Sequence, residues 1–508
     1  MNDFQHRSAE INDLLCILNL LAWDARTQMP AGGSPTRAQQ TATLSGLAQR
    51  QLLDPAYERA AEAALSTAEP GSVAARAAEQ ALGAVRALRR VPEDLTRDLA
   101  LTKSAAQDAW VEARARGDFG HFAPHLTRMV DLTRRLADAL GHREHPYDAL
   151  LGLYEPGLTT RTLGELFSQL RPHHLSLLRD VQARPQPRLD FLARDYGVAE
   201  QEVLALELAQ ATGYDLARGR LDASAHPFEI SFTREDVRIT TRYRPDFLPG
   251  ALFGVLHEAG HAMYEQGVSP ELTRSVLTSD LLGLYAVGGA SYGTHESQSR
   301  LWENRVGRSR AFWDRHFPRA QALFPSQLAD VTAEEFWRAV NRVQPSLIRV
   351  EADELTYDLH IMLRVDLETA LIAGDLTVPE LPEAWNARME ADLGLKVPDD
   401  ARGVLQDIHW SAGLFGSFPT YTVGNVMAAQ FFEAAQAALP DLGASLARGE
   451  YGPLRTWLTE QIYRHGRTYT PHELLERTTG RGLDPAPYLA YLSGKYRDLY
   501  GLTAKETA

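Results

Sequence analysis

The feature that most constrains the fold of this chain is a succession of long segments with helical periodicity. They are rich in Ala, Leu, Arg and Glu, which favour helices, and their apolar residues recur at intervals of three and four positions. The predicted helices are 35–53, 55–65, 72–90, 92–116, 122–140, 163–181 and 334–372, with several more after residue 380. Pro345 should break or kink the last of the seven, because proline has no N–H to donate within a helix.

One segment departs from this pattern and alternates apolar with polar residues. The alternation runs from Phe228 to Phe232, pauses at the polar residues 234–236, and resumes from Val237 to Tyr243. A period of two on both sides of a short turn predicts a β-hairpin. Its edge could pair with an extended peptide, or the small sheet could only support the helix that follows it. We therefore predict a mainly α fold with one small β-hairpin.

Composition indicates one large folded body. The 508 residues are 44% hydrophobic and 23% charged, which is enough apolar material for a sizeable core. We found no linker, repeat or low-complexity tract, so we predict a single helical domain over 1–508, pinched into two lobes by a groove. The net charge of −14 argues against a nucleic-acid partner, which would require a concentrated basic surface.

Cysteine usage and the N-terminal segment predict a cytoplasmic location. Cys16 is the only cysteine, so the chain can form no internal disulfide and no cysteine-based metal site. The apolar piece 14–22 contains Asn19 and follows several acidic residues, unlike a secretory signal. No run reaches the ~18 apolar residues of a membrane span.

The pentad 257–261, His-Glu-Ala-Gly-His, lies within an apolar segment that should be helical. Pro249 suits the first turn of this helix and Gly267 its end. Residues four apart are separated by ~6 Å and about 40° on a helix, so His257 and His261 share one face and can bind one metal ion. Glu258 lies about 100° round the helix from His257, where it could act as a general base without being a ligand. The alternative is a buried helix with two structural histidines, each of which would need its own hydrogen-bond partners.

A hydrolytic zinc site keeps three protein ligands and one open position. The best candidate for the third ligand is Glu296, in a segment that reads as the start of a second helix with Thr294 as its N-cap. An ordinary carboxylate in the first turn of a helix would look the same. Glu303 and Asp280 are further candidates, and Glu265 is better placed to orient a ligand than to be one.

Several motifs occur here in an order that resembles the zinc metallocarboxypeptidases of the carboxypeptidase Taq family. The pentad extends to Gln266 as His-Glu-Ala-Gly-His-Ala-Met-Tyr-Glu-Gln and is followed by His295-Glu296-Ser297-Gln298. The stretch 267–292 between them is longer than is usual in the family, with an extra apolar piece at 277–285. The other matching motifs are Trp23-Asp24, Met29-Pro30, Arg37, Tyr147-Asp148, Tyr154-Glu155-Pro156-Gly157, His226-Pro227-Phe228, Asp236-Val237-Arg238-Ile239-Thr240, Ile348-Arg349-Val350-Glu351-Ala352-Asp353 and Gly403-Val404-Leu405-Gln406-Asp407-Ile408-His409-Trp410.

The resemblance implies a large helical body with a deep active-site groove beside the hairpin and the zinc helix. It implies a carboxypeptidase in which Glu258 takes a proton from the attacking water and gives it to the leaving amine. His409 and Tyr421 resemble the pair that polarises the carbonyl in related helical zinc peptidases. A buried structural histidine is the alternative for His409.

Removal of C-terminal residues requires a cation for the terminal carboxylate, and arginine suits a two-pronged contact. Arg349 is the first choice and Arg238 the second. Either could instead be a buried structural partner, for example of Asp353 or of Asp236. His226 lies where a loop could close one end of the groove, or could belong to a tight turn into the hairpin.

Three functions therefore compete: a zinc carboxypeptidase, a zinc oligopeptidase that cuts internally, and a non-enzymatic helical scaffold with a structural metal. A free Glu258 beside three ligands argues against the scaffold, because a structural zinc fills its fourth position with protein. Cobalt or manganese could replace zinc at such a site. The resemblance also implies peptide substrates, broad tolerance for the terminal side chain, and a homodimer.

Overall fold

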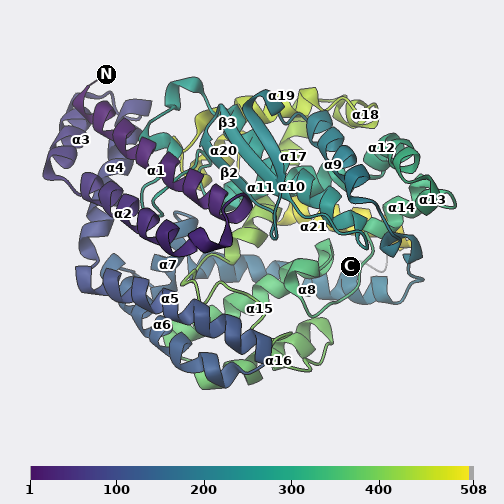
Figure 1. Ribbon diagram of the computed structural model, residues 1–508. Coiled ribbons are helices and arrows are strands. Elements are labelled where there is room, and N and C mark those ends of the chain that lie inside the picture. The colour runs from purple at the N-terminus through teal and green to yellow at the C-terminus, as the bar shows by residue number, and fades with distance from the viewer. Residues whose placement is uncertain (1, 503–508) are drawn as a thin grey trace. The chain divides into compact units, whose positions relative to one another are not determined.

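Helices make up most of the computed structural model, which describes residues 2–502 (Figure 1). The prediction of a mainly α fold is confirmed. Six of the seven predicted helices occur, and none of their ends is shifted by more than three residues. Among the described residues, no helix combines the length and the apolar character needed to cross a membrane.

The chain forms two compact units, each assembled from separate stretches of sequence. Unit 1 comprises Met1–Leu88, Pro187–Val340 and Met427–Leu483, and unit 2 comprises Arg89–Gln186, Asn341–Val426 and Asp484–Ala508. The organisation as one domain with two lobes stays a prediction, and each unit is described by itself below.

Within residues 2–502, unit 1 contains the N-terminal helices, every strand and the helix with the His-Glu-Ala-Gly-His pentad. α1 and α2 pack along each other (Figure 1). The helices of unit 1 are α1 (Asp3–Thr27), α2 (Ser34–Leu52), α3 (Pro55–Thr67), most of α4 (Val73–Arg90), α9 (Val198–Thr212), α10 (Leu248–Gly267), α11 (Tyr292–Arg300), α12 (Arg310–Leu323), α13 (Pro325–Leu328), α14 (Ala333–Val340), α18 (Leu442–Ala447), α19 (Gly452–Gln461) and α20 (Pro471–Thr479).

The predicted hairpin is present as β2 (Glu229–Thr233) and β3 (Asp236–Thr241), which pair antiparallel. A third strand that the sequence did not reveal, β1 (Gly219–Ala223), pairs parallel to β3, so the strand order is β1-β3-β2. Val237 and Ile239 of β3 are fully buried, and β2 and β3 both contact α10. The outer edge of β2 is partly covered by α1, because Asn19 donates a hydrogen bond to the carbonyl oxygen of Ser231 (2.7 Å). The sheet therefore supports α10, as one of the two interpretations proposed.

The connection between α10 and α11 packs into the core of unit 1. It contains the short strands β4 (Ser279–Asp280) and β5 (Tyr285–Ala286), which pair antiparallel. Val276, Leu281 and Ala286 are buried against α1, α3 and α4. Asn12 of α1 donates to the Ser279 hydroxyl (2.7 Å). The apolar piece noticed in the sequence thus has a packing role, and it ties the connection to the N-terminal helices.

Unit 2 is built around the buried helix α15, whose polar side chains hold its neighbours. Asp358 accepts hydrogen bonds from Thr422, Asn425 and Tyr488 and contacts His174. The helices of unit 2 are α5 (Glu93–Arg116), α6 (Phe119–Leu140), α7 (Pro146–Tyr154), α8 (Thr160–Gln182), α15 (Glu354–Ala373), α16 (Leu381–Leu393) and α21 (Ala486–Tyr500), and the chain passes into unit 1 within α17 (Pro419–Ala438).

The predicted helix 334–372 is wrong as a single helix. The structure has α14, then residues 341–353 without α-helix, then α15. Pro345 breaks the helix as expected, but the interruption is longer than a kink. It persists because Asp353 caps the new helix, accepting hydrogen bonds from the backbone amides of Leu355 and Thr356 (both 3.0 Å). The short 3₁₀ turn Arg349–Glu351 lies in this interruption.

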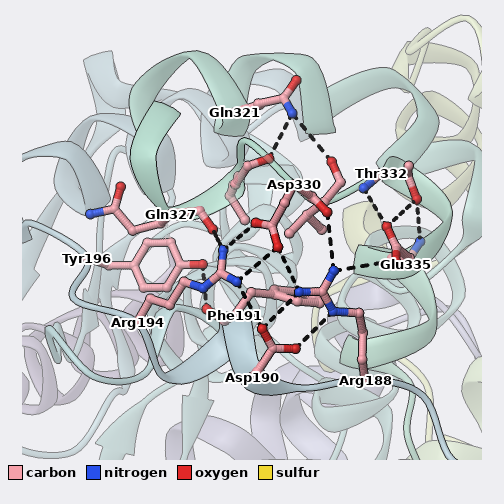
Figure 2. Close-up of polar contacts among 12 residues, drawn as sticks. Arg188, Asp190, Phe191, Arg194, Tyr196, Gln321, Gln327, Asp330, Thr332 and Glu335 are labelled. Carbon is pink, nitrogen blue, oxygen red and sulfur yellow. Dashed lines mark hydrogen bonds and ion pairs between the residues drawn. The ribbon is translucent and has the colours of Figure 1, made fainter.

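A surface network of ion pairs fixes the segment 188–196 of unit 1 to the loop after α13 (Figure 2). Asp330 contacts Arg188 (2.9 Å) and Arg194 (2.6 Å), and Asp190 contacts the same two arginines (2.8 and 2.9 Å). These hydrogen bonds to arginine hold the pKa of Asp330 well below its ordinary value. A network that shares each charge between two partners is a better stabiliser than an isolated surface pair.

Replacement of Asp330 by Asn should lower the Tm at neutral pH. The depressed pKa means that the carboxylate contributes stability above its unfolded-state pKa and loses that contribution as the pH falls. The difference in Tm between variant and parent should shrink in ~1 M salt, where the Debye length is about 3 Å. Thermal unfolding followed by circular dichroism measures both effects, with Asp314→Asn, an exposed carboxylate on α12, as the control. An equal Tm deficit in low and high salt would contradict the electrostatic origin.

Candidate metal centre and associated residues

Helix α10 is largely buried and carries His257 and His261, which are themselves partly exposed. Pro249 lies in its first turn and Gly267 is its last residue, as predicted. Apolar residues such as Leu252, Val255 and Leu256 are fully buried around it, which fixes the rotation of the helix. The two imidazole rings lie one turn apart with centroids separated by 5.0 Å. The spacing of the pentad therefore places both rings on one face of α10.

Glu296 reaches these rings from α11. Its Oε2 lies 3.6 Å from Nε2 of His257 and 3.4 Å from Nε2 of His261. The two helices approach closely at Gly260, where a Cβ atom would lie 2.6 Å from the carbonyl oxygen of Gln298. Glycine inside the pentad thus permits the contact that brings Glu296 to the histidines. The predicted N-cap Thr294 is wrong: α11 begins earlier, and Ser291 is the cap that accepts from the Thr294 amide.

These three side chains fit a divalent metal ion. One ligand atom from each lies within 4.8 Å of the others. Bonds of about 2.0–2.2 Å in a tetrahedral arrangement separate neighbouring ligand atoms by about 3.4 Å, close to the two distances to Glu296. Arg300 donates to the other oxygen of Glu296 (2.7 Å), which leaves Oε2 directed at the histidines. Burial lowers the pKa of His257, but Glu296 and Glu303 more than offset this and raise it to about 9. The site therefore attracts positive charge.

The imidazole rings of His257 and His261 are each contacted through Nδ1, the nitrogen that does not face Glu296. Nδ1 of His257 lies 2.9 Å from Oε2 of Glu303, which follows α11 in the π-helical turn Leu301–Gly307. Arg308 donates to the other oxygen of Glu303 (3.0 Å). Glu303 therefore orients His257 through its far nitrogen, and the structure does not place it among the three candidate ligands. Asp280, the other alternative, accepts the backbone amides of Leu282 and Gly283 instead.

Behind His261 lies His295, and behind His295 lies Glu265. Glu265 was predicted to orient a ligand, but its contact is with His295 and not with His261 itself. Nε2 of His295 lies 2.9 Å from Oε1 of Glu265. Nδ1 of His295 in turn lies within hydrogen-bonding distance of Nδ1 of His261. The role of His295 was not foreseen, although its position beside Glu296 was a signal.

Glu258 is buried beside this group without belonging to it, at 6% exposure. Burial raises the pKa of its carboxyl to about 7; the nearby His257 opposes this shift, and Glu296 and Glu303 add to it. The backbone amide of Glu229, the first residue of β2, donates a hydrogen bond to this carboxylate. The hairpin therefore helps to orient Glu258. A buried carboxyl that titrates near neutrality can take and return a proton.

Arg349 lies in unit 2 and is bound to Asp407. Its Nε and Nη2 donate to Oδ1 of Asp407 (3.0 and 2.8 Å), and its Nη1 donates to the Tyr357 hydroxyl (3.0 Å). Arg364 donates to the other oxygen of Asp407 (2.6 Å). The structural partner of Arg349 is thus Asp407 and not Asp353. The three side chains hold two positive charges and one negative charge, so this buried cluster carries one excess positive charge.

His409 and Tyr421 are also in unit 2 and contact each other. Nε2 of His409 lies 3.3 Å from the Tyr421 hydroxyl, and its ring lies against Phe418 with centroids 4.3 Å apart. Burial lowers the pKa of His409 to about 4, with Asp407 opposing the shift. His409 is therefore neutral at physiological pH. Its Nδ1 is buried without a hydrogen-bond partner in the described structure.

The segment that carries His409 is anchored by side chains that sequence reasoning missed. Glu368 of α15 is fully buried and accepts hydrogen bonds from Trp410 (2.8 Å) and the Gly416 amide (3.0 Å). Arg364, one turn earlier, is also fully buried. Charged residues at positions 358, 364 and 368, each next to apolar residues in this helix, were the available signal, since charges are buried only with partners.

Arg238 and His226 lie in unit 1 and have different surroundings. Arg238 forms a two-pronged pair with Asp236 (2.9 and 2.8 Å) and stacks between Trp23 and Phe232, 4.3 and 4.7 Å from their ring centres. This is the structural alternative that the sequence left open. His226 is exposed in the loop between β1 and β2. A substrate-binding role for either residue stays a prediction.

Comparison with known proteins gives a consistent result. The family model described as carboxypeptidase Taq (M32) metallopeptidase matches residues 3–496. The chain is 44% identical to thermostable carboxypeptidase 1 of Thermus thermophilus, covering 98% of each sequence, and 37% identical to carboxypeptidase 1 of Bacillus subtilis, covering 95% of each. It is also similar to the crystal structure of an M32 carboxypeptidase from Deinococcus radiodurans, with a TM-score of 0.94, 43% identity, and coverage of 98% of this chain and 99% of that one.

Proposed function

Because this chain belongs to the carboxypeptidase Taq (M32) metallopeptidase family, and is therefore a metal-dependent carboxypeptidase, we propose that His257, His261 and Glu296 hold its metal ion. The observation that carries this proposal is the convergence of three donor atoms, within 4.8 Å of one another, beside a buried glutamate that is not one of them. Three ligands and a separate base are the protein groups of a hydrolytic site, in contrast to the four protein ligands of a structural one.

We propose zinc as the metal, with cobalt or manganese as possible replacements. Two imidazoles and one carboxylate suit all three ions, and a bound divalent ion would act as a Lewis acid that polarises a carbonyl and lowers the pKa of water. Arg300 and Glu303 contribute by holding the ligands: Arg300 fixes Oε1 of Glu296, and Glu303 fixes the ring of His257. Such partners typically set the orientation and basicity of ligands.

Glu258 is the proposed general base and acid. Its carboxylate takes a proton from the attacking water as the oxygen adds to the peptide carbonyl carbon. The same proton then passes to the leaving amine as the carbon–nitrogen bond breaks. The backbone amide of Glu229 supports the charged form of this carboxylate by a hydrogen bond. The products are a free amino acid and a peptide shortened by one residue.

His409 and Tyr421 are the proposed donors to the negative charge that develops on the carbonyl oxygen. This role rests on the resemblance of their segments, and their mutual contact supports it. A neutral His409 can donate from one ring nitrogen, and the Tyr421 hydroxyl donates its own proton. Pre-oriented donors of this kind stabilise the transition state more than the substrate.

Replacement of Tyr421 by Phe should therefore lower kcat about a hundredfold, the usual effect of removing one such donor. The hydroxyl is lost while the ring is kept, so binding of a product-like inhibitor should change little. Steady-state kinetics and an inhibition constant measure the two quantities, with Tyr469→Phe in unit 1 as the control. Equal losses in rate and inhibitor binding would show that Tyr421 only shapes the site.

Arg349 is the proposed receptor for the terminal carboxylate of the substrate. The excess positive charge it shares with Arg364 and Asp407 would be balanced by a carboxylate ligand. Its guanidinium keeps N–H groups beyond the three used in the contacts described above. A fixed cation at this point restricts cleavage to the end of a chain.

The two alternative functions, an internally cutting oligopeptidase and a scaffold with a structural metal, are not favoured by the family. The test is digestion of a peptide with a free C-terminus, followed by mass spectrometry and metal analysis. We expect a ladder shortened one residue at a time, abolished by a chelator and restored by zinc. Internal fragments would indicate an oligopeptidase, and turnover that persists without metal would contradict the proposal.

The homodimer and the cytoplasmic location are proposed on sequence grounds. The homodimer rests on the family resemblance, and the location on the single cysteine, Cys16. Burial raises the pKa of the Cys16 thiol to about 12, so it is a poor nucleophile. We likewise propose that peptides of varied C-terminal sequence are substrates.

A further inference from the structure

We propose that His295 is a positioning residue for the metal site. It links the carboxylate of Glu265 to His261 through hydrogen bonds, and the glycine pair Gly288-Gly289 of the α10–α11 connection holds its ring in place. The proposal rests on the assignment of His261 as a metal ligand. It gives the long connection a function beyond packing.

A chain of contacts connects the candidate metal ligand His261 to the buried carboxylate of Glu265. Nδ1 of His261 meets Nδ1 of His295, and Nε2 of His295 meets Oε1 of Glu265 at 2.9 Å. The planes of the two imidazoles differ by 24° and their centroids lie 4.5 Å apart. The rings are therefore close to parallel, and their facing Nδ1 atoms lie within hydrogen-bonding distance of each other.

These contacts determine which ring nitrogen carries the proton in His261 and in His295. A ring nitrogen that binds a metal must offer its lone pair, so Nε2 of His261 is bare and its Nδ1 carries the proton. Nδ1 of His295 must then accept that hydrogen bond, which leaves the proton of His295 on Nε2, facing Glu265. Both oxygens of Glu265 accept from the Gly288 amide (2.9 and 2.8 Å), and Oε1 also accepts from the Gly289 amide (3.0 Å). Each hydrogen bond in this chain of contacts then has one donor and one acceptor.

The two histidines proposed as metal ligands, His257 and His261, therefore have different hydrogen-bond partners at Nδ1. His257 donates directly to a carboxylate, that of Glu303. His261 donates to a neutral ring, and the carboxylate of Glu265 stands one ring further away. A direct carboxylate partner increases the basicity of an imidazole ligand. The intervening ring of His295 should therefore keep His261 a weaker donor than His257 while still fixing its orientation.

The glycine pair supplies the space that this arrangement needs. A Cβ atom on Gly289 would lie 2.3 Å from Cδ2 of His295, and one on Gly288 would lie 2.9 Å from Oε2 of Glu265. Both distances are shorter than van der Waals contact allows. The backbone of the connection thus packs directly against His295 while its amides bind Glu265. On its other side, the ring of His295 lies nearly parallel to that of Tyr264, at 16° and 5.4 Å between centroids.

The test measures metal binding by the apoprotein in competition with a chromophoric chelator, using zinc. His295→Leu removes both hydrogen bonds and should weaken zinc binding by about 10- to 100-fold, as loss of such partners does elsewhere. His295→Gln offers an oxygen for His261 and an N–H for Glu265, so it should recover part of that loss. Gly289→Ala removes no polar group but displaces the ring, and should also weaken binding. Gly443→Ala, where a Cβ meets nothing within 4 Å, is the matched control and should bind as the parent does.

A second readout separates positioning from general damage to the fold. The visible spectrum of the cobalt-substituted protein reports ligand geometry and should shift in His295→Leu and Gly289→Ala but not in Gly443→Ala. Thermal unfolding of each apoprotein shows that the variants fold. Zinc binding within twofold of the parent in His295→Leu, or equal losses in the Leu and Gln variants, would overturn the proposal. His261→Leu distinguishes the premise: if that variant binds zinc as the parent does, the ligand assignment itself is wrong.

Discussion

Replacement of Glu258 by Gln should lower kcat by about three orders of magnitude while the metal stays bound, within the range expected for loss of a general base. Gln keeps the shape of the side chain and can still accept from the Glu229 amide, but it cannot take a proton from water. The three candidate ligands are untouched, because Glu258 is not one of them. Steady-state kinetics on a free-acid peptide and metal analysis of the same sample measure the two effects. Glu271→Gln, an exposed carboxylate just after α10, is the control.

The pH dependence of the parent should report the same group. Glu258 must be ionised to act as a base, so the rate falls as the pH drops below the pKa of its carboxyl. Burial raises this pKa to about 7 in the protein without metal, and a bound divalent cation lowers it. The acid limb of kcat/KM should therefore lie at or below pH 7, and the residual activity of Glu258→Gln should lack it. His409, neutral above a pKa of about 4, adds no limb between pH 5 and 9. Full activity in Glu258→Gln would remove Glu258 from the mechanism.

The local elements of this fold could be predicted from the sequence because local physics determines them. The periodicity of each long segment and the alternation of the hairpin specify helix and strand without reference to the rest of the chain. Predictions failed where a distant or competing interaction decides. β1 is a strand only because β3 is available as a partner. Ser291, and not Thr294, caps α11, although both residue types favour that position.

The same distinction applies to the candidate site. His257, Glu258 and His261 lie on one helix, so their relative positions follow from helix geometry alone. The histidine–glutamate pair at 295–296 was visible as a motif. The side chains that support these residues come from elsewhere in the chain. Glu303 lies 46 positions from His257, and Arg364 lies 43 positions from Asp407. A buried charge in an apolar helix signals that a partner exists, but only the fold identifies it.

The second large effect should follow replacement of Arg349 by Ala. If its guanidinium binds the terminal carboxylate, kcat/KM on free-acid peptides should fall roughly a thousandfold, since loss of one partner of a buried charged contact costs about 2–5 kcal/mol. Unit 2 should tolerate the change, because Asp407 keeps Arg364 as a partner and the cluster becomes neutral. Arg349→Lys keeps the charge without the planar fork and should recover only part of the activity.

C-terminally amidated peptides decide between recognition and structure in this variant. They lack the carboxylate, so the parent should cleave them poorly, and Arg349→Ala should cleave them no worse than the parent does. Arg402→Ala, which removes an exposed arginine paired with Asp399, controls for loss of charge in the same unit. Rates on free-acid and amidated versions of one peptide give the comparison directly. A loss of equal size on both would show that Arg349 only holds Asp407 and Tyr357 in place, and the carboxylate receptor would have to be sought among the other cations.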